Sequence, residues 1–158
     1  MKKTLIAVVA VFALLLVFTS AQSTAPADGK VGSVAPNISL RNAHTAFSLQ
    51  QMRGKYVLLS FWSSQDAQSR FDNAQYEQAA LDNDIAYVGI NFDPSEVVFN
   101  EILKIDRLKS NSQFRVAGNM AETLSKSFHL ENHYATYLIS PQGEVISRNP
   151  SVDELAKI

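Results

Sequence analysis

The chain has 158 residues, of which 46% are hydrophobic and 18% are charged, as is ordinary for one globular domain. It contains no cysteine, which excludes a lipid-modified cysteine anchor. With 14 Lys and Arg against 15 Asp and Glu, the net charge of −1 gives no electrostatic basis for binding nucleic acid or an anionic membrane.

The first segment has the parts of a secretory signal. Two lysines precede an apolar run from Leu5 to Phe18, and small residues follow it. Fourteen apolar residues are fewer than the roughly 20 that a membrane span needs. We therefore predict a signal peptide over residues 1–21, cleaved after Ala21, with Ala25 as a second candidate. An uncleaved N-terminal membrane anchor is the alternative, and it would be the chain's one contact with a membrane.

Cleavage there would remove two of the 14 basic residues and none of the 15 acids, leaving a net charge of −3. The Ser, Thr, Ala, Pro and Gly content of residues 22–30 predicts a disordered linker. The folded domain is expected over residues 31–158, with no internal repeat and no second domain.

The apolar run Tyr56–Phe61 predicts a strand buried on both faces, as in the middle of a parallel or mixed sheet. Before it, short strands are expected at Asn37–Leu40 and Thr45–Phe47, with one helical turn at Ser48–Met52. The elements expected after it are a helix over Gln65–Leu81, a strand over Ile85–Phe92, a helix from Pro94 to about Leu108, a short strand at Phe114–Val116, a helix capped by Asn119, a hairpin of Thr136–Ile139 and Glu144–Arg148, and a last short helix from Ser151.

Helical spacing of apolar residues predicts the inward face of each long helix. The predicted faces are Ala67, Phe71, Ala74, Gln78 and Leu81 in the first helix, Val98, Ile102 and Ile105 in the second, and Met120, Leu124 and Phe128 in the third.

The segment Phe61–Arg70 resembles the Phe-Trp-Ala-Ser-Trp-Cys-x-x-Cys-Arg motif of TlpA-like, AhpC/TSA-like thiol–disulfide oxidoreductases of the bacterial envelope. Three further stretches are similar to motifs of that group in the same order. They are Val31–Leu40, Phe47–Val57 and Ala135–Ile146. The resemblance implies an α/β fold, a thioredoxin-like three-layer α/β/α sandwich with a central mixed sheet and an N-terminal β-hairpin extension.

The residues that carry the chemistry of this family are replaced. Asp66 and Ser69 stand where the resemblance places the two redox cysteines, and Tyr134 stands where it places a cis-proline that faces them. Ser60 replaces the buried acid of thioredoxins proper. Because a cis bond before a non-proline residue costs about 2.5–4 kcal/mol, we predict a trans His133–Tyr134 bond and a remodelled loop.

Asp66 has a structural interpretation. An acid in the first turn of a helix is stabilised by the helix dipole, and Ser63-x-x-Asp66 fits a capping box. A thiolate at this helix end would have its pKa lowered, whereas a carboxylate is a permanent anion without redox chemistry.

Other constellations are weaker. His129 and His133 have metal-like spacing, but no third ligand is apparent nearby except Glu131, so we expect no metal. Asp66 and Asp93, at the ends of neighbouring strands, could form an acid pair. A Ser-His-acid triad could combine Ser63 or Ser64 with a histidine and Asp93, although no Gly-x-Ser-x-Gly motif supports it.

The sequence therefore predicts a redox-inactive thioredoxin-like domain exported to the periplasm or cell envelope, with no catalytic residue and no cofactor. Its expected partner is a protein or peptide, bound in a groove made by Trp62, Ser63, Ser64, Gln65, His133 and Ala135. One alternative is an enzyme, either a thiol–disulfide oxidoreductase or peroxidase by similarity or an unrecognised cysteine-independent activity. Another is a structural accessory of a larger assembly.

Overall fold

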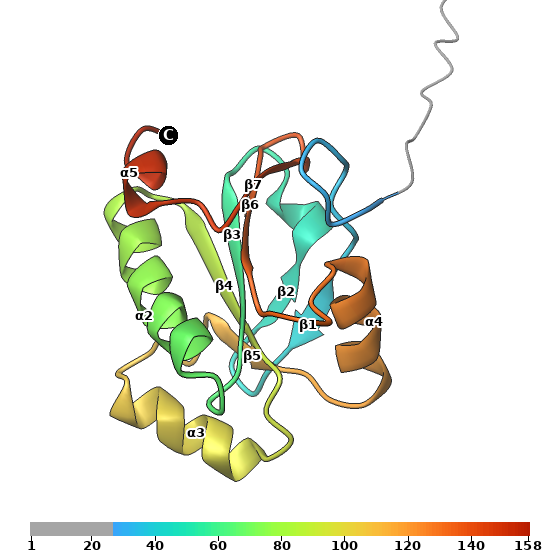
Figure 1. Ribbon diagram of the computed structural model, residues 1–158. Helices are drawn as coiled ribbons and strands as arrows, with labels where there is room; N and C mark the ends of the chain where they lie inside the picture. Colours follow the sequence, from blue (N-terminus) through green and yellow to red (C-terminus); the bar gives the residue numbers. More distant parts are fainter. Residues whose placement is uncertain (1–26) are drawn as a thin grey trace, which may run out of the picture.

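A five-stranded mixed sheet forms the centre of the computed structural model, which describes residues 27–158 (Figure 1). The predicted signal peptide, its cleavage site and residues 22–26 lie outside the described residues. The strand order is β5-β4-β3-β6-β7. The strands are β3 (Val57–Trp62), β4 (Ala86–Asn91), β5 (Gln113–Arg115), β6 (Thr136–Ile139) and β7 (Val145–Arg148).

The predicted central strand is β3, and all six of its residues are buried. It pairs in parallel with β4, from Val57 opposite Ala86 to Trp62 opposite Asn91. On its other side it pairs antiparallel with β6, where Val57 lies opposite Ile139. The carboxyl end of β3 therefore lies beside the carboxyl end of β4 and the start of β6.

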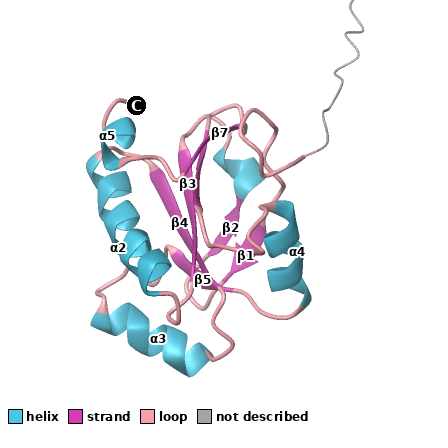
Figure 2. Ribbon diagram, viewed as in Figure 1, coloured by secondary structure: helices cyan, strands magenta, loops and turns pink. Residues whose placement is uncertain are grey.

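Helices cover both faces of the sheet (Figure 2). On one face lie α2 (Ala67–Asp82), α3 (Glu96–Ile105) and the short α5 (Val152–Leu155). On the other lie α4 (Asn119–Ser127), the hairpin of β1 (Ser39–Arg41) and β2 (Ala46–Ser48), and the 3₁₀ turn η1 (Leu49–Met52). The predicted three-layer α/β/α architecture with an N-terminal hairpin is confirmed.

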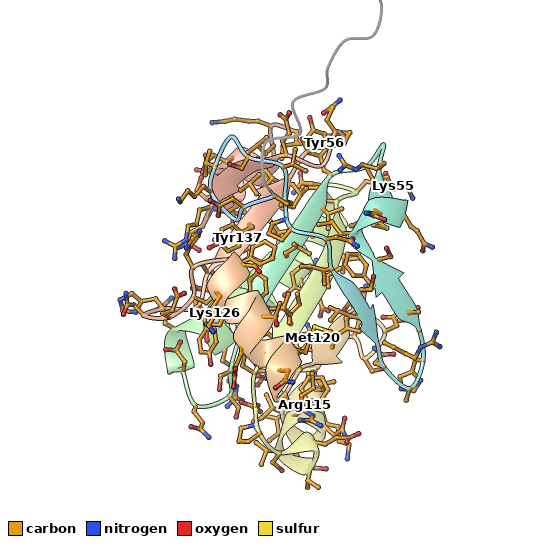
Figure 3. All side chains as sticks on the ribbon, turned by 90° about the vertical axis from the view of Figure 1, so that its right-hand side faces the viewer. Lys55, Tyr56, Arg115, Met120, Lys126 and Tyr137 are labelled. Atoms are coloured by element: carbon orange, nitrogen blue, oxygen red, sulfur yellow. The ribbon has the colours of Figure 1, made fainter. Side chains whose placement is uncertain are left out.

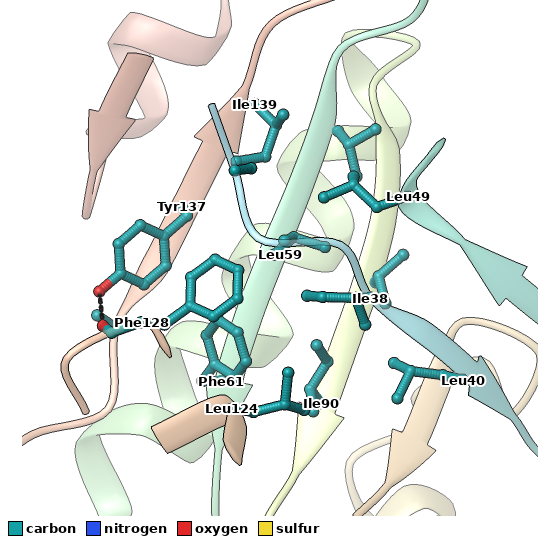
Figure 4. Packing of buried hydrophobic residues seen from close by; sticks show 14 of the residues in the cluster. Ile38, Leu40, Leu49, Leu59, Phe61, Ile90, Leu124, Phe128, Tyr137 and Ile139 are labelled. Atoms are coloured by element: carbon teal, nitrogen blue, oxygen red, sulfur yellow. Dashed lines mark hydrogen bonds between the residues drawn. The ribbon is translucent and has the colours of Figure 1, made fainter. Parts of the chain in front are cut away.

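The largest cluster of buried side chains lies between the sheet and the layer of α4 and the hairpin (Figure 4). Phe61 and Phe128 are 4.9 Å apart between ring centroids, and Tyr137 packs edge-on against both. The Tyr137 hydroxyl donates a hydrogen bond to the carbonyl of Phe128. This bond fixes the end of α4 against β6.

The inward face of α2 differs from the prediction. Phe71 and Leu81 are 59% and 49% exposed, and the buried side chains are Ser69, Asn73, Glu77, Ala79 and Ala80. Polar groups on and next to the sheet explain the difference, because they form hydrogen bonds with the polar residues on this face of the helix. The Tyr87 hydroxyl donates to the backbone carbonyl of Asn73 at 3.0 Å, and the Ser112 hydroxyl donates to Glu77 at 2.6 Å.

The predicted faces of α3 and α4 are also wrong in part. In α3 the buried residues are Phe99 and Leu103, which pack around Trp62, while Val98 and Ile105 are exposed. In α4 Leu124 is buried, as is Phe128 at its end, whereas Met120 is exposed near the start of the helix (Figure 3).

Two boundaries also need correction. Gly118, and not Asn119, is the N-cap of α4, and Asn119 is its first residue. The disordered linker predicted over residues 22–30 extends too far toward the domain, because Asp28 and Gly29 form backbone hydrogen bonds with it. The N–H of Asp28 donates to the carbonyl of Val34, and the N–H of Gly29 donates to that of Ser127. The described domain therefore includes Asp28, three residues before the predicted start.

Asn42 attaches the hairpin to the edge strand β5. Its Oδ1 accepts from the N–H groups of His44 and Thr45 within the turn, each at 2.8 Å. Its Nδ2 donates to the carbonyls of Ser110 and Gln113, each at 2.9 Å. One side chain thus shapes the turn and occupies a backbone carbonyl of the sheet edge.

None of the helices within residues 27–158 is long and apolar enough to cross a membrane.

Candidate functional site

The junction between β3 and α2 is the place where the sequence predicts the site. Asp66 is the N-cap of α2, and its Oδ1 accepts a hydrogen bond from the N–H of Ser69 at 2.6 Å. The predicted capping box from Ser63 is wrong, because Asp66 itself takes the capping position. Asp is among the preferred N-cap residues, since its carboxylate satisfies an otherwise unpaired N–H at the positive end of the helix.

Ser69 ties the start of α2 to the end of β3. Its hydroxyl is buried, donates to the carbonyl of Asp66 at 3.2 Å and accepts from the N–H of Ser63 at 3.3 Å. Both positions that the resemblance assigns to redox cysteines are therefore occupied by side chains that hydrogen-bond the local backbone.

Asp93, just beyond the end of β4, holds the loop between β3 and α2 in place. Its side chain is 1% exposed and accepts from the Ser63 hydroxyl at 2.7 Å, the Ser64 N–H at 2.9 Å and the Asn91 amide at 3.0 Å. The Asn91 oxygen accepts in turn from the Asp93 N–H at 2.9 Å. A buried carboxylate with three donors is fully satisfied, which makes this loop rigid.

Tyr134 lies across the same loop and is half-buried. Its ring packs against Phe92 with centroids 5.5 Å apart, and the His133–Tyr134 peptide bond is trans. Burial raises the pKa of Tyr134, and the carboxylates of Asp93 and Asp66 add to the rise, whereas hydrogen bonding to Ser63 opposes it. The phenol that stands where the resemblance places a proline therefore lies within electrostatic range of both acids.

The structure changes the composition of the predicted groove. Trp62 is 0% exposed and donates its Nε1–H to Gln113 at 3.0 Å, and Ser63 and Ala135 are also buried. The burial of Trp62 and of Phe128 counts against a groove lined by aromatic rings. The accessible side chains are those of Ser64, which is half-buried, and of Gln65 and His133, which are exposed.

Histidines take no part in this network. The Ser63 hydroxyl reaches Asp93 directly, and within residues 27–158 no histidine is hydrogen-bonded to either, so the suggested triad is not assembled. His129 instead contacts Asp28, with 2.6 Å between Nε2 and Oδ1. The described part of the chain has no group of three or more His, Cys, Asp or Glu that could hold a metal ion.

Two ionic features near the site were not predicted. Arg70 forms a bidentate pair with Asp106, at 2.6 Å from Nε and 2.5 Å from Nη2, which joins α2 to the end of α3. This pair raises the pKa of the Arg70 guanidinium. Glu77 is an acid on the buried face of α2, and its carboxylate oxygens accept from the Lys109 N–H at 3.2 and 3.3 Å. No local pattern in the sequence indicates either, because each depends on contacts more than 30 residues apart.

Comparison with known proteins identifies the family. The AhpC/TSA family model matches residues 31–148, three quarters of the chain. The chain belongs to the AhpC/TSA family. A thioredoxin-like protein from Parabacteroides distasonis is 30% identical to it, with a TM-score of 0.69 over 82% of this chain and 94% of that one. The comparison with curated proteins finds no match.

Two further solved structures share the fold of this AhpC/TSA family member at lower identity. One is the thioredoxin domain of a thiol-disulfide oxidoreductase from Bacteroides vulgatus, with 21% identity, a TM-score of 0.70 and coverage of 81% and 94% of the two chains. The other is a thiol-disulfide oxidoreductase from Bacteroides fragilis, with 24% identity, a TM-score of 0.64 and coverage of 75% and 91%. The resemblance to TlpA-like proteins with a thioredoxin fold is confirmed.

Proposed function

We propose that this protein is a redox-inactive thioredoxin-like domain of the bacterial envelope, which binds an extended segment of a partner protein. The observation that carries the proposal is the chemistry at the start of α2. Thiol–disulfide exchange requires a thiolate nucleophile, and the chain has no cysteine. At the corresponding positions Asp66 caps the helix and Ser69 bonds the loop backbone.

A backbone edge beside this helix end supports binding of an extended chain. The Ala135 carbonyl accepts from the Phe61 N–H at 3.0 Å, so pairing between β3 and the chain before β6 reaches Ala135. The backbone N–H and carbonyl groups of His133 and Tyr134 make no hydrogen bond within residues 27–158. An extended peptide can pair with such groups as an added strand. Gln65 and His133 would flank it.

Export is part of the proposal. The first 21 residues have the charge and apolar pattern of a secretory signal. The two similar Bacteroides structures are thiol-disulfide oxidoreductases, and disulfide chemistry belongs to oxidising compartments such as the periplasm.

Photo-crosslinking in the native envelope tests the binding role. A photoreactive residue replaces Gln65, and a matched control replaces Gln142, an exposed residue in the β6–β7 turn at the opposite end of the sheet. We expect discrete products at Gln65 only. His133→Pro should abolish them because proline has no N–H, whereas His133→Ala should retain them. Equal products at Gln142, no product at Gln65, or insensitivity to His133→Pro would contradict the groove.

Insulin reduction tests the redox part separately. The wild-type chain should not accelerate reduction over buffer, because it cannot form a mixed disulfide. Turnover by this cysteine-free protein would overturn the proposal in favour of an unrecognised enzymatic activity.

A further inference from the structure

A hollow beside His133 gathers four basic side chains. Its volume is about 470 Å³, and its walls include Lys30, His129, His133, Tyr137 and Arg148. These residues come from four segments, namely the chain before β1, the loop between α4 and β6, strand β6 and strand β7. We call it the cationic pocket.

Arg148 is held in a defined position at this pocket. Its Nε donates to the Tyr137 hydroxyl at 3.0 Å, and its Cζ lies 5.8 Å from the centre of the Tyr137 ring. Tyr137 is itself buried and bonded to the Phe128 carbonyl. The two terminal amino groups of Arg148 make no hydrogen bond within residues 27–158. A guanidinium fixed at Nε with free terminal N–H groups is suited to bind a carboxylate or phosphate.

His129 occupies a backbone conformation that ordinarily favours glycine. Its φ is +52°, at the position directly after the last turn of α4, where a side chain other than Gly or Asn is disfavoured. The imidazole is placed next to Asp28, whose carboxylate also lies 3.3 Å from the Lys30 ammonium. Hydrogen bonding to His129 lowers the pKa of Asp28, and the Asp28 carboxylate lies between the two basic side chains.

The charges around the pocket leave an excess of positive charge. Lys30 and Arg148 are permanent cations, and Asp28 offsets one of them. Glu131, the one acid in the loop between α4 and β6, is exposed and forms no ion pair with the described basic residues. His129 and His133 add positive charge when protonated. On a chain whose net charge is negative, this is a local site for an anion.

We propose that the cationic pocket selects an acidic residue in the partner segment, whose carboxylate binds the terminal amino groups of Arg148. This inference rests on the proposed function, because His133 lines the pocket and immediately precedes Tyr134 in the backbone edge offered to the peptide. Because His133 belongs both to that edge and to the pocket wall, we expect a chain paired there to reach the pocket with one of its side chains. The ligand class is therefore a peptide rich in Asp or Glu.

Fluorescence anisotropy with the full chain tests this selection, with labelled hexaglutamate and hexaglutamine as probes. We expect hexaglutamate to bind at least about tenfold more tightly at low salt, since charge-assisted hydrogen bonds are about twice as strong as neutral ones. Arg148→Gln should weaken hexaglutamate binding about fivefold or more, and Arg148→Lys should weaken it less. The matched control is Arg41→Gln, which removes the same charge from an exposed position on β1 and should leave binding within about twofold.

Equal affinity for the two peptides would overturn the inference, as would equal losses in Arg148→Gln and Arg41→Gln. Displacement of hexaglutamate by an equal concentration of inorganic phosphate would also overturn it, since the pocket would then bind a free anion. Crosslinking from Gln65 separates the two proposals. If crosslinks persist without charge selection, only the cationic pocket fails. If hexaglutamate binds through Arg148 but Gln65 gives no crosslinks, only the groove fails.

Discussion

Introducing cysteines at positions 66 and 69 is the most direct test of the proposed redox-inactive site. In the variant Asp66→Cys with Ser69→Cys, the helix loses the capping hydrogen bond that the Asp66 carboxylate accepts from the Ser69 N–H. Such a bond is typically worth about 1 kcal/mol. It also loses the two long hydrogen bonds of the Ser69 hydroxyl, together worth about 1–2 kcal/mol. The reduced variant should therefore be less stable than the wild type by about 2–3 kcal/mol.

Oxidation should recover most of this loss. Residues i and i+3 of a helix lie on one face, near enough for a disulfide, and closing so short a loop stabilises the fold by about 2 kcal/mol in the chain-entropy estimate. Melting temperatures of the oxidised and reduced forms should differ by roughly 3–8 °C. The control, Asp66→Ala with Ser69→Ala, should melt at one temperature whatever the redox potential.

Insulin reduction by the same variant tests the role of the Tyr134 loop. We expect slow turnover by the double variant and faster turnover once Tyr134→Pro is added, because Tyr134 stands where the resemblance places the cis-proline that faces the dithiol, and its half-buried ring packs on Phe92 instead. Failure of the dithiol to oxidise would refute the placement of residues 66 and 69. Efficient catalysis by the double variant alone would show that the Tyr134 loop was no part of the loss.

Two further substitutions test the polar contacts that position the site and the hairpin. Asp93→Asn should lower the free energy of unfolding by about 3 kcal/mol or more in urea titration, since an amide cannot accept from Ser63, Ser64 and Asn91 together. Asp72→Asn, on the outer part of α2, is the control, and a loss below about 1 kcal/mol at Asp93 would contradict the network. Asn42→Asp keeps the turn acceptor but sets a carboxylate oxygen against the carbonyls of Ser110 and Gln113, so thermal unfolding should show a loss of about 2 kcal/mol. The exposed Asn111→Asp should change little, and an equal loss there would assign the effect to charge alone.

The order of strands and helices could be predicted because its signals are local. Tyr56–Phe61 has no polar residue except Ser60, and a run of that kind fits a strand buried on both faces. The turn at Ser140–Gly143 has Pro and Gly where a β-turn needs them, and Gly143 has a φ of +78°. The order of the strands within the sheet was predicted from the four stretches that resemble family motifs in the same order. The periodicity of apolar residues alone would not have given it.

The orientation of helices α2 and α3 could not be predicted from periodicity. The rule assumes that the sheet presents an apolar surface, but beneath α2 it presents Ser60, Tyr87 and Gln113, so a polar stripe is buried there. In α3 apolar residues occur on more than one face. The choice of Phe99 over Val98 depends on the position of Trp62, which lies 37 residues earlier in the chain.

Each of the three residues at the positions that the resemblance assigns to the redox site has a structural use of its own, which bears on the proposed function. Asp66 satisfies the first turn of α2, Ser69 bonds the loop backbone directly after β3, and Tyr134 packs on Phe92. Asp93 immobilises the loop that joins them. An exchange enzyme must expose a sulfur and let a mixed disulfide form and resolve, whereas a binding surface gains affinity from rigidity, because less freedom is lost on association. Under the proposed function, the residues at these three positions therefore favour a pre-organised platform, and introducing the family's residue at one of them alone should weaken the platform without giving exchange.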